Sequence, residues 1–149
     1  MFDTVLIAGL GLMGGSMAKT IKARTLSRVL GWNRTRATAE QALADSSIDA
    51  IATEALYKEA DLVIIGLYPQ ATVDWLLENM PKMKKGCVIV DMVGVKQFMV
   101  NHLEQAALDA GVHYVGGHPM AGREFSGLDF ALPTLFDGAS MIFVPTKSS

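Results

Sequence analysis

Glycines near the N-terminus have the spacing of a turn that binds phosphate groups. Residues 9–16 read GLGLMGGS and directly follow the apolar run VLIA, so a G-x-G-x-x-G pattern lies between an expected strand and an expected helix. The N-terminus of such a helix offers free N–H groups and a partial positive charge to phosphates. A tight turn without a ligand is the alternative. We expect a dinucleotide to bind at Gly9, Leu10, Gly11, Leu12, Met13 and Gly14.

The residues after the second expected strand bear on which dinucleotide binds. A carboxylate at this position accepts hydrogen bonds from the adenosine ribose and repels a 2′-phosphate. Here the position is Asn33, followed by Arg34, Thr35 and Arg36. Asn33 could bond a ribose hydroxyl without repelling phosphate, and Arg34 could stack on adenine or pair with a 2′-phosphate. A solvated helix start is the alternative for both arginines, so NAD and NADP both stay open.

Of the three histidines, His118 is the one whose position could bring it to a bound ligand. It lies in GGHPMAG, residues 116–122, after an expected strand, whereas His102 lies in a polar helical run and His113 opens a strand. Ligands of parallel α/β sheets gather at the carboxyl ends of the strands, so this segment can reach the same crevice as the glycine turn. The residues alone leave a catalytic histidine and an ordinary loop histidine equally open.

Apolar runs of strand length alternate with segments of helical period along the chain. This pattern predicts a single α/β domain over residues 1–149, of the Rossmann type, doubly wound around a mainly parallel sheet. Strands are expected at 4–8, 29–32, 49–53, 62–67, 88–91 and 112–115, with an edge strand at 140–144. Helices are expected at 13–24, 72–79 and 95–110, and from a cap at Thr35 to residue 45. Residues 116–127 are expected to form a loop.

Composition narrows the functional class. The 149 residues carry a formal charge of -2 and no basic patch, so a nucleic-acid partner is not expected. Cys87 is the single cysteine, and we interpret it as a small buried side chain in a protein of a reducing compartment. The apolar N-terminal stretch is too short for a bilayer and lacks a preceding basic segment. We expect a cytoplasmic protein with no membrane contact and no metal site.

Four segments together resemble the N-terminal half of the prephenate (or arogenate) dehydrogenases. They are GLGLMGGS, DMVGVK at 91–96, GGHPMAGREFSG at 116–127 and LFDGASMIFVP at 135–145, and the resemblance covers about residues 4–145. It implies an enzyme of tyrosine biosynthesis that uses NAD or NADP to oxidise and decarboxylate prephenate to 4-hydroxyphenylpyruvate, or arogenate to tyrosine. A dehydrogenase of the 6-phosphogluconate or β-hydroxyacid type is disfavoured by the histidine segment. A dinucleotide-sensing module without catalysis is the remaining alternative.

The resemblance also implies roles for individual residues. His118, as a neutral imidazole, would accept the proton of the ring C4 hydroxyl while hydride leaves C4 for the nicotinamide. Lys96 and Glu124 are candidates for substrate contact, with solvated surface positions as the alternative. The cofactor groove is expected to be lined further by Leu67, Tyr68 and Pro69, whereas Trp32 and Trp75 are interpreted as packing residues.

The sequence departs from the family in two places. Many members have serine in a D-x-G-S-x-K segment, and here Gly94 takes its place, so that backbone groups, a water or the hydroxyl of Ser126 could substitute. The helical C-terminal domain of the family, which dimerises and supplies cations for the substrate, is absent from this chain. We therefore expect the complete protein to be a homodimer and the isolated chain to bind dinucleotide but to turn over its small-molecule substrate poorly.

Overall fold

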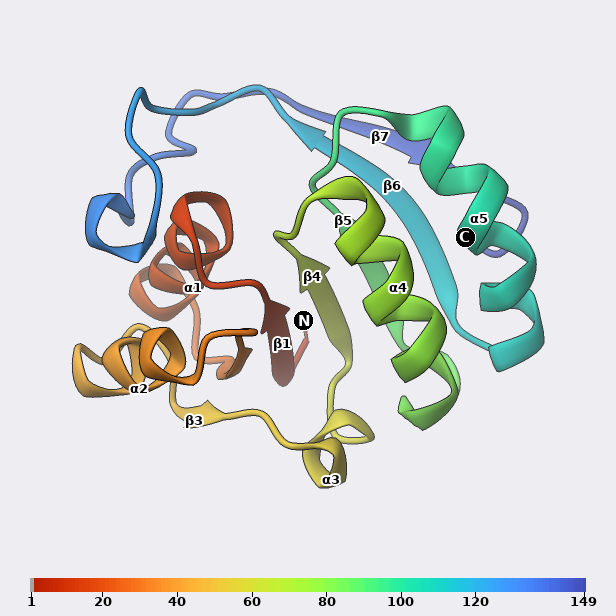
Figure 1. Cartoon of the computed structure of the whole chain (residues 1–149), viewed down its shortest axis with the longest axis horizontal. Helices are drawn as coiled ribbons and strands as arrows, with labels where there is room; N and C mark the ends of the chain where they lie inside the picture. The colour runs from red at the N-terminus through yellow and green to blue at the C-terminus, as the bar shows by residue number, and fades with distance from the viewer. Residues whose placement is uncertain (1) are drawn as a thin grey trace.

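The computed structural model describes residues 2–149, which form one seven-stranded sheet with the strand order β3-β2-β1-β4-β5-β6-β7 (Figure 1). All neighbouring strands are parallel except β6 and β7. The chain returns from β3 to place β4 beside β1, which creates a switch point between these two strands. The predicted Rossmann-type fold is confirmed. The strands are β1 (Thr4–Ala8), β2 (Arg28–Trp32), β3 (Ala50–Ile51), β4 (Leu62–Ile65), β5 (Val88–Asp91), β6 (His113–Pro119) and β7 (Met141–Pro145).

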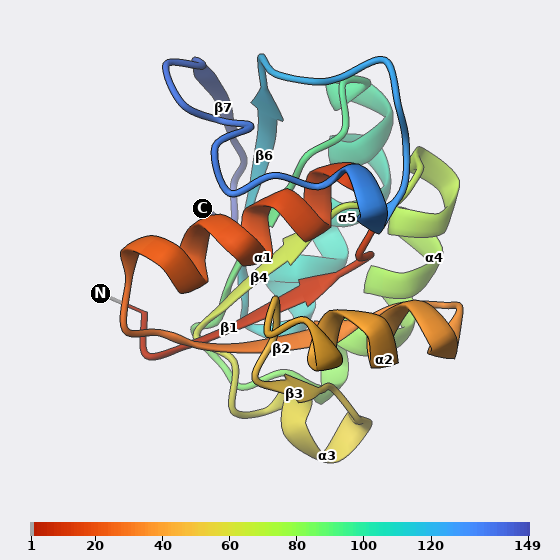
Figure 2. The same cartoon turned by 90° about the vertical axis from the view of Figure 1, so that its left-hand side faces the viewer.

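Helices cover both faces of the sheet. Figure 1 shows α1 and α2 on one side of the central strands and α4 and α5 on the other, and the turned view of Figure 2 places α1 and α2 nearest the viewer. Alternate residues of β1 serve the two faces, because successive side chains of a strand point in opposite directions. The helices are α1 (Leu12–Arg24), α2 (Arg36–Ala44), α3 (Glu54–Tyr57), α4 (Pro69–Asn79) and α5 (Lys96–Ala110), with 3-10 turns η1 (Met80–Lys82) and η2 (Leu128–Phe130).

Several predicted limits and one predicted cap differ from the structure, and two of the differences have a plain physical reason. The strand predicted to reach Leu67 ends at Ile65, and Pro69 opens α4 instead of preceding it, because proline needs no hydrogen-bonded N–H in the first helical turn. β6 continues to Pro119, where a loop was predicted, because β7 pairs with it antiparallel up to Met141. The expected capping of α2 by the Thr35 side chain is not seen, although Thr35 occupies the N-cap position.

No helix within residues 2–149 has the length and apolar character needed to cross a bilayer. The expected cytoplasmic location stays a prediction. Cys87 is buried as predicted, and burial raises the pKa of its thiol to about 12, which keeps it protonated and unreactive.

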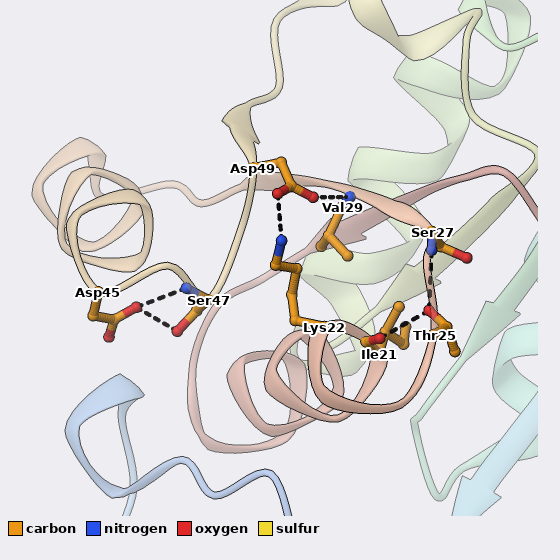
Figure 3. A network of polar contacts seen from close by, with 8 residues as sticks. All are labelled: Ile21, Lys22, Thr25, Ser27, Val29, Asp45, Ser47 and Asp49. Atoms are coloured by element: carbon orange, nitrogen blue, oxygen red, sulfur yellow. Dashed lines mark hydrogen bonds and ion pairs between the residues drawn. The ribbon is translucent and has the colours of Figure 1, made fainter.

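Asp49 joins three elements beneath the α1 face of the sheet. Asp49 lies just before β3. Its carboxylate pairs with Lys22 of α1 and accepts a hydrogen bond of 2.7 Å from the backbone N–H of Val29 in β2 (Figure 3). Burial of Asp49 opposes its ionisation, but the bonds from Lys22 and from the Val29 N–H outweigh it and lower the pKa of the carboxyl. The ionised form of Asp49 therefore stabilises the fold.

We expect Asp49→Asn to lower the free energy of unfolding by about 1 kcal/mol at pH 7. Because the folded-state pKa is depressed, the contribution is complete above the unfolded-state pKa of about 3.9 and is lost as the pH falls through the lower folded value. Urea denaturation from pH 7 down to pH 2.5 should show the difference from the parent shrinking in acid. Asp109→Asn, at an exposed position of α5, is the control; a constant difference at all pH values would contradict this role for Asp49.

Candidate active site

The glycine turn between β1 and α1 is built by direct contact of three backbones. Gly9 has a φ of +93°, in the left-handed region that favours glycine, and a Cβ on it would lie 2.6 Å from the carbonyl oxygen of Gly66, after β4. A Cβ on Gly14 would lie 1.7 Å from the carbonyl oxygen of Gly9. Gly11 is different, because a Cβ there would meet no atom within 4 Å. Gly9 and Gly14 thus pack the turn against β4, while Gly11 faces open space.

A groove of about 840 Å³ starts at this turn and crosses the carboxyl ends of β4 and β5. Of the residues predicted to contact cofactor, nine line it: Gly9, Gly11, Leu12, Met13, Asn33, Arg34, Leu67, Tyr68 and Pro69. The predicted substrate residues Gly94, Glu124 and Ser126 line the same groove from its other end. Leu10, Gly14, Thr35, Lys96 and His118 do not line it. The structure therefore brings most of the predicted residues together along one surface.

The Asn33 side chain joins the end of β2 to the glycine turn by hydrogen bonding. Its side-chain oxygen accepts a hydrogen bond of 2.9 Å from the backbone N–H of Leu10, and its side-chain nitrogen donates to the carbonyl oxygen of Thr35 at 3.1 Å. Leu10 itself is fully buried, which explains why it lies outside the groove. An amide side chain has two N–H donors, so one hydrogen of Asn33 is left for a ligand.

His118 lies in β6 opposite the segment that follows β5. A Cβ on Gly94 would lie 3.4 Å from the Cε1 atom and 3.5 Å from the Nε2 atom of the His118 ring, an ordinary van der Waals contact. The imidazole is half-buried, and its strand is held from the other side by the pairing of His118 with Ile142 of β7. Gly117 lets β6 approach β5 closely, because a Cβ on it would lie 2.4 Å from the carbonyl oxygen of Asp91.

A buried carboxylate shapes the segment that carries Gly94. Asp91 is fully buried, and its Oδ1 atom accepts a bond of 3.0 Å from the Val93 N–H and pairs with the Lys96 ammonium. Its Oδ2 atom accepts a hydrogen bond from the Tyr114 hydroxyl. Burial and the adjacent Asp91 carboxylate raise the pKa of Tyr114, so the phenol stays protonated and can donate. With only 15% of its side chain exposed, Lys96 is not a solvated surface lysine, and its charge is matched by Asp91.

The loop after β6 forms the far wall of the groove. Arg123, Glu124 and Ser126 are exposed there, and the Arg123 guanidinium donates a bond of 2.7 Å to the carbonyl oxygen of Phe130. The same guanidinium lies 5.8 Å and 6.0 Å from the ring centroids of Phe125 and Phe130. Sequence reasoning missed Arg123, and its presence as the single cation in the segment GREFSG was the signal that could have singled it out.

The other two histidines are held by backbone oxygens away from the groove. His102 is exposed on α5 and its Nδ1 atom lies 2.8 Å from the carbonyl oxygen of Phe98. His113 opens β6, where its Nδ1 atom lies 2.8 Å from the carbonyl oxygen of Ser148. Neither ring lines the groove, so His118 is the one histidine next to it within residues 2–149.

A glycine turn at the switch point of a parallel sheet, opening onto a groove at the strand ends, defines a dinucleotide-binding domain of the Rossmann type. Residues 17–149 match the family model described as "Prephenate dehydrogenase, nucleotide-binding domain". The chain belongs to this family. The match begins at Met17, just after the glycine turn, and includes Asn33, Gly94 and His118.

Curated relatives extend the similarity to the whole chain. A prephenate dehydrogenase of Bacillus subtilis (strain 168) is 37% identical over 153 residues, which cover 100% of this chain and 41% of that protein. A prephenate dehydrogenase of Lactococcus lactis subsp. cremoris is 31% identical over 150 residues, covering 97% of this chain and 41% of that protein. The chain thus spans about two fifths of the length of these relatives.

Solved structures agree with the family assignment. Prephenate dehydrogenase from A. aeolicus, in complex with hydroxyphenyl propionate and NAD+, superposes with a TM-score of 0.89 at 27% identity, over 100% of this chain and 52% of that one. Synechocystis arogenate dehydrogenase superposes with a TM-score of 0.86 at 25% identity, over 97% of this chain and 51% of that one. In both cases this chain corresponds to about half of the solved polypeptide.

Two alanine substitutions in the glycine turn should affect different properties, one mainly stability and the other mainly binding. Gly14→Ala should lower the free energy of unfolding by about 3 kcal/mol or more, because its Cβ would overlap the Gly9 carbonyl. Gly11→Ala should cost less than about 1 kcal/mol, because its Cβ meets open space, yet weaken dinucleotide binding by about tenfold or more. Denaturant titration and calorimetry measure the two quantities. Equal stabilities of the two variants would contradict this division of roles.

Proposed function

We propose that this chain is the cofactor-binding and histidine-bearing part of an NAD-dependent prephenate dehydrogenase of tyrosine biosynthesis. The observation that carries the proposal is a single groove that runs from the glycine turn to Gly94. The Gly94 backbone lies next to the His118 ring. The B. subtilis and L. lactis relatives bear the name prephenate dehydrogenase, which supports this choice of substrate. Arogenate is the alternative, supported by the similarity to the Synechocystis enzyme.

The residues of the turn fit a dinucleotide. The open space at Gly11 admits a pyrophosphate close to the backbone. Leu12 and Met13, in the first turn of α1, line the groove, and the first N–H groups of a helix have no partner within it. The solved A. aeolicus relative contains NAD+, which supports the same cofactor here. When bound, the nicotinamide supplies the hydride acceptor. Tyr68 and Pro69 would bound the cofactor by shape, since they line the groove at the start of α4.

His118 would act as the base. Its neutral imidazole would accept the proton of the substrate C4 hydroxyl through Nε2, the ring nitrogen that faces Gly94. Hydride would leave C4 for the nicotinamide, and the ring carboxylate would leave as CO2, its bonding electrons making the ring aromatic. The protonated His118 would then return its proton to the phenolate oxygen of the product. Gly94 carries no side-chain hydroxyl, so we propose that the substrate oxygen, or a water beside it, occupies the space next to His118. Ser126 supplies a hydroxyl only from the far wall of the groove.

Lys96 and Arg123 would have different roles. Lys96 is matched by Asp91 and holds the segment 91–96 in place, so we assign it to positioning the site. Arg123 lines the groove, forms no ion pair within residues 2–149, and is free to meet a substrate carboxylate. Glu124 beside it would then orient or gate the substrate. In the complete protein a further, helical domain is expected to close the site and to form a homodimer.

The test of the proposed base is His118→Asn in the complete protein. Asparagine keeps the size and polarity of the position but cannot take the proton, so turnover of prephenate should fall by about 10²–10⁴-fold. Affinity for NAD+ should be unchanged, because His118 does not line the cofactor groove. His102→Asn, on the exposed face of α5, is the matched control. Full turnover in His118→Asn would end the proposed role of His118 as the base.

The end of β2 also permits a 2′-phosphate, and we propose that the chain accepts NADP+ as well. The position at the end of β2 is Asn33, which carries no carboxylate to repel a phosphate, and its side-chain oxygen already accepts a bond from the Leu10 N–H. Arg34 lines the groove and has no ion-pair partner within residues 2–149. Arg34→Ala should weaken NADP+ binding by about tenfold to a hundredfold and NAD+ binding much less. Calorimetric titrations with both cofactors measure this. An equal loss for both would mean that Arg34 contacts the adenine instead.

A further inference from the structure

A second, smaller cleft lies on the α4 side of the sheet, apart from the dinucleotide groove. It has a volume of about 280 Å³, and it lies where the end of β2, the segment after β3, α3 and the second half of α4 meet. The two sites share no lining residue. The side chains that the following argument uses are Trp32, Glu54, Tyr57, Trp75 and Glu78.

Aromatic rings form the walls of this cleft. The ring centroid of Trp75 lies 5.5 Å from that of Trp32, at an interplanar angle of 51°. Tyr57 lies on the other side of Trp75, also at 5.5 Å and tilted by 58°. Both tryptophans pack against the core as predicted, yet they also line the cleft. The faces of aromatic rings carry negative potential and attract cations.

The Tyr57 hydroxyl has no partner in the part of the chain that the structure describes. Tyr57 as a residue is only 3% exposed, and no hydrogen bond joins its hydroxyl to another of residues 2–149. No fully buried side-chain nitrogen or oxygen in this range lacks a partner, so the phenol oxygen must open onto the cleft that Tyr57 lines. The phenol oxygen is therefore accessible from the cleft, where it can accept a hydrogen bond from a ligand.

The charges around the cleft are negative. Glu54 and Glu78 line it, and burial, followed by the charges of these two carboxylates, raises the pKa of Tyr57 to about 12. Lys82 pairs with Glu54 at 2.6 Å but does not line the cleft. Glu78 forms no ion pair within residues 2–149, and no basic side chain is among the lining residues. Glu78 therefore contributes a carboxylate without an ion-pair partner in this range to the lining of the cleft.

We propose that this cleft binds a small organic primary ammonium ion. Its alkyl part would contact the rings of Trp32 and Trp75, and its charged nitrogen would lie between these rings and the Glu78 carboxylate. One N–H of the ammonium would be donated to the Tyr57 hydroxyl. A neutral ligand of the same shape lacks the charge that the rings and the carboxylate select, and an anion is repelled by the Glu78 carboxylate.

Intrinsic tryptophan fluorescence tests the proposal directly, because Trp32 and Trp75 are the only two tryptophans in the chain and both line the cleft. The 149-residue chain is titrated with n-propylammonium chloride, with sodium chloride at the same ionic strength, and with 1-propanol as a neutral molecule of the same size. A saturable change of emission is expected with propylammonium alone. Glu78→Gln should weaken this binding by about two- to fivefold.

Two further variants distinguish binding in the cleft from a general effect of the protein's charge. Asp74→Asn removes a carboxylate from α4 outside the cleft, where Asp74 bonds to Gln70, and should leave the affinity unchanged. Tyr57→Phe keeps the ring and should also weaken binding. The proposal is overturned if 1-propanol or sodium chloride gives the same response as propylammonium. It is equally overturned if Glu78→Gln and Tyr57→Phe, shown to be folded by circular dichroism, bind propylammonium as tightly as the parent.

Discussion

Direct contact between the backbones of Gly9, Gly14 and Gly66 fixes where α1 begins relative to the sheet. A side chain on Gly14 would overlap the Gly9 carbonyl, and one on Gly9 would overlap the Gly66 carbonyl. Because no Cβ separates them, the start of α1 lies directly against the end of β4, at the switch point of the sheet. The helix N-terminus thereby points its free N–H groups into the groove, and Asn33 holds the turn in this position from β2.

The opposite end of the groove follows the same principle. Gly117 brings β6 against the Asp91 carbonyl, and the Asp91 carboxylate is satisfied by Val93, Lys96 and Tyr114. A buried charge is tolerated only when its partners are in place, so the segment 91–96 has little freedom to move. His118 and Gly94 therefore face each other across a distance set by packed backbones. Backbone contacts at glycines thus position both ends of the site, and the exposed loop residues Arg123 and Glu124 form its far wall.

Local patterns made much of the fold predictable from the sequence. β1 and β5 have the predicted limits, because short apolar runs bounded by polar residues define a strand by themselves. The extension of β6 through His118 was not predictable, since it depends on pairing with β7 more than twenty residues later in the chain. The pairing of Lys96 with Asp91 was not predictable either, because it depends on which side chains meet at the buried carboxyl end of β5. The second cleft, around Tyr57, likewise arises from segments that meet only in the fold.

Amide chemical-shift mapping of the chain during titration with NAD+ tests whether the groove at the glycine turn binds a dinucleotide. Saturable shifts are expected for the amides of residues that line the groove: Gly9, Gly11, Leu12, Met13, Asn33, Arg34, Leu67, Tyr68 and Ala71. The amides of α2 and of the amino ends of the strands should stay unchanged. Absence of any shift at saturating NAD+, or shifts confined to other parts of the chain, would contradict the account.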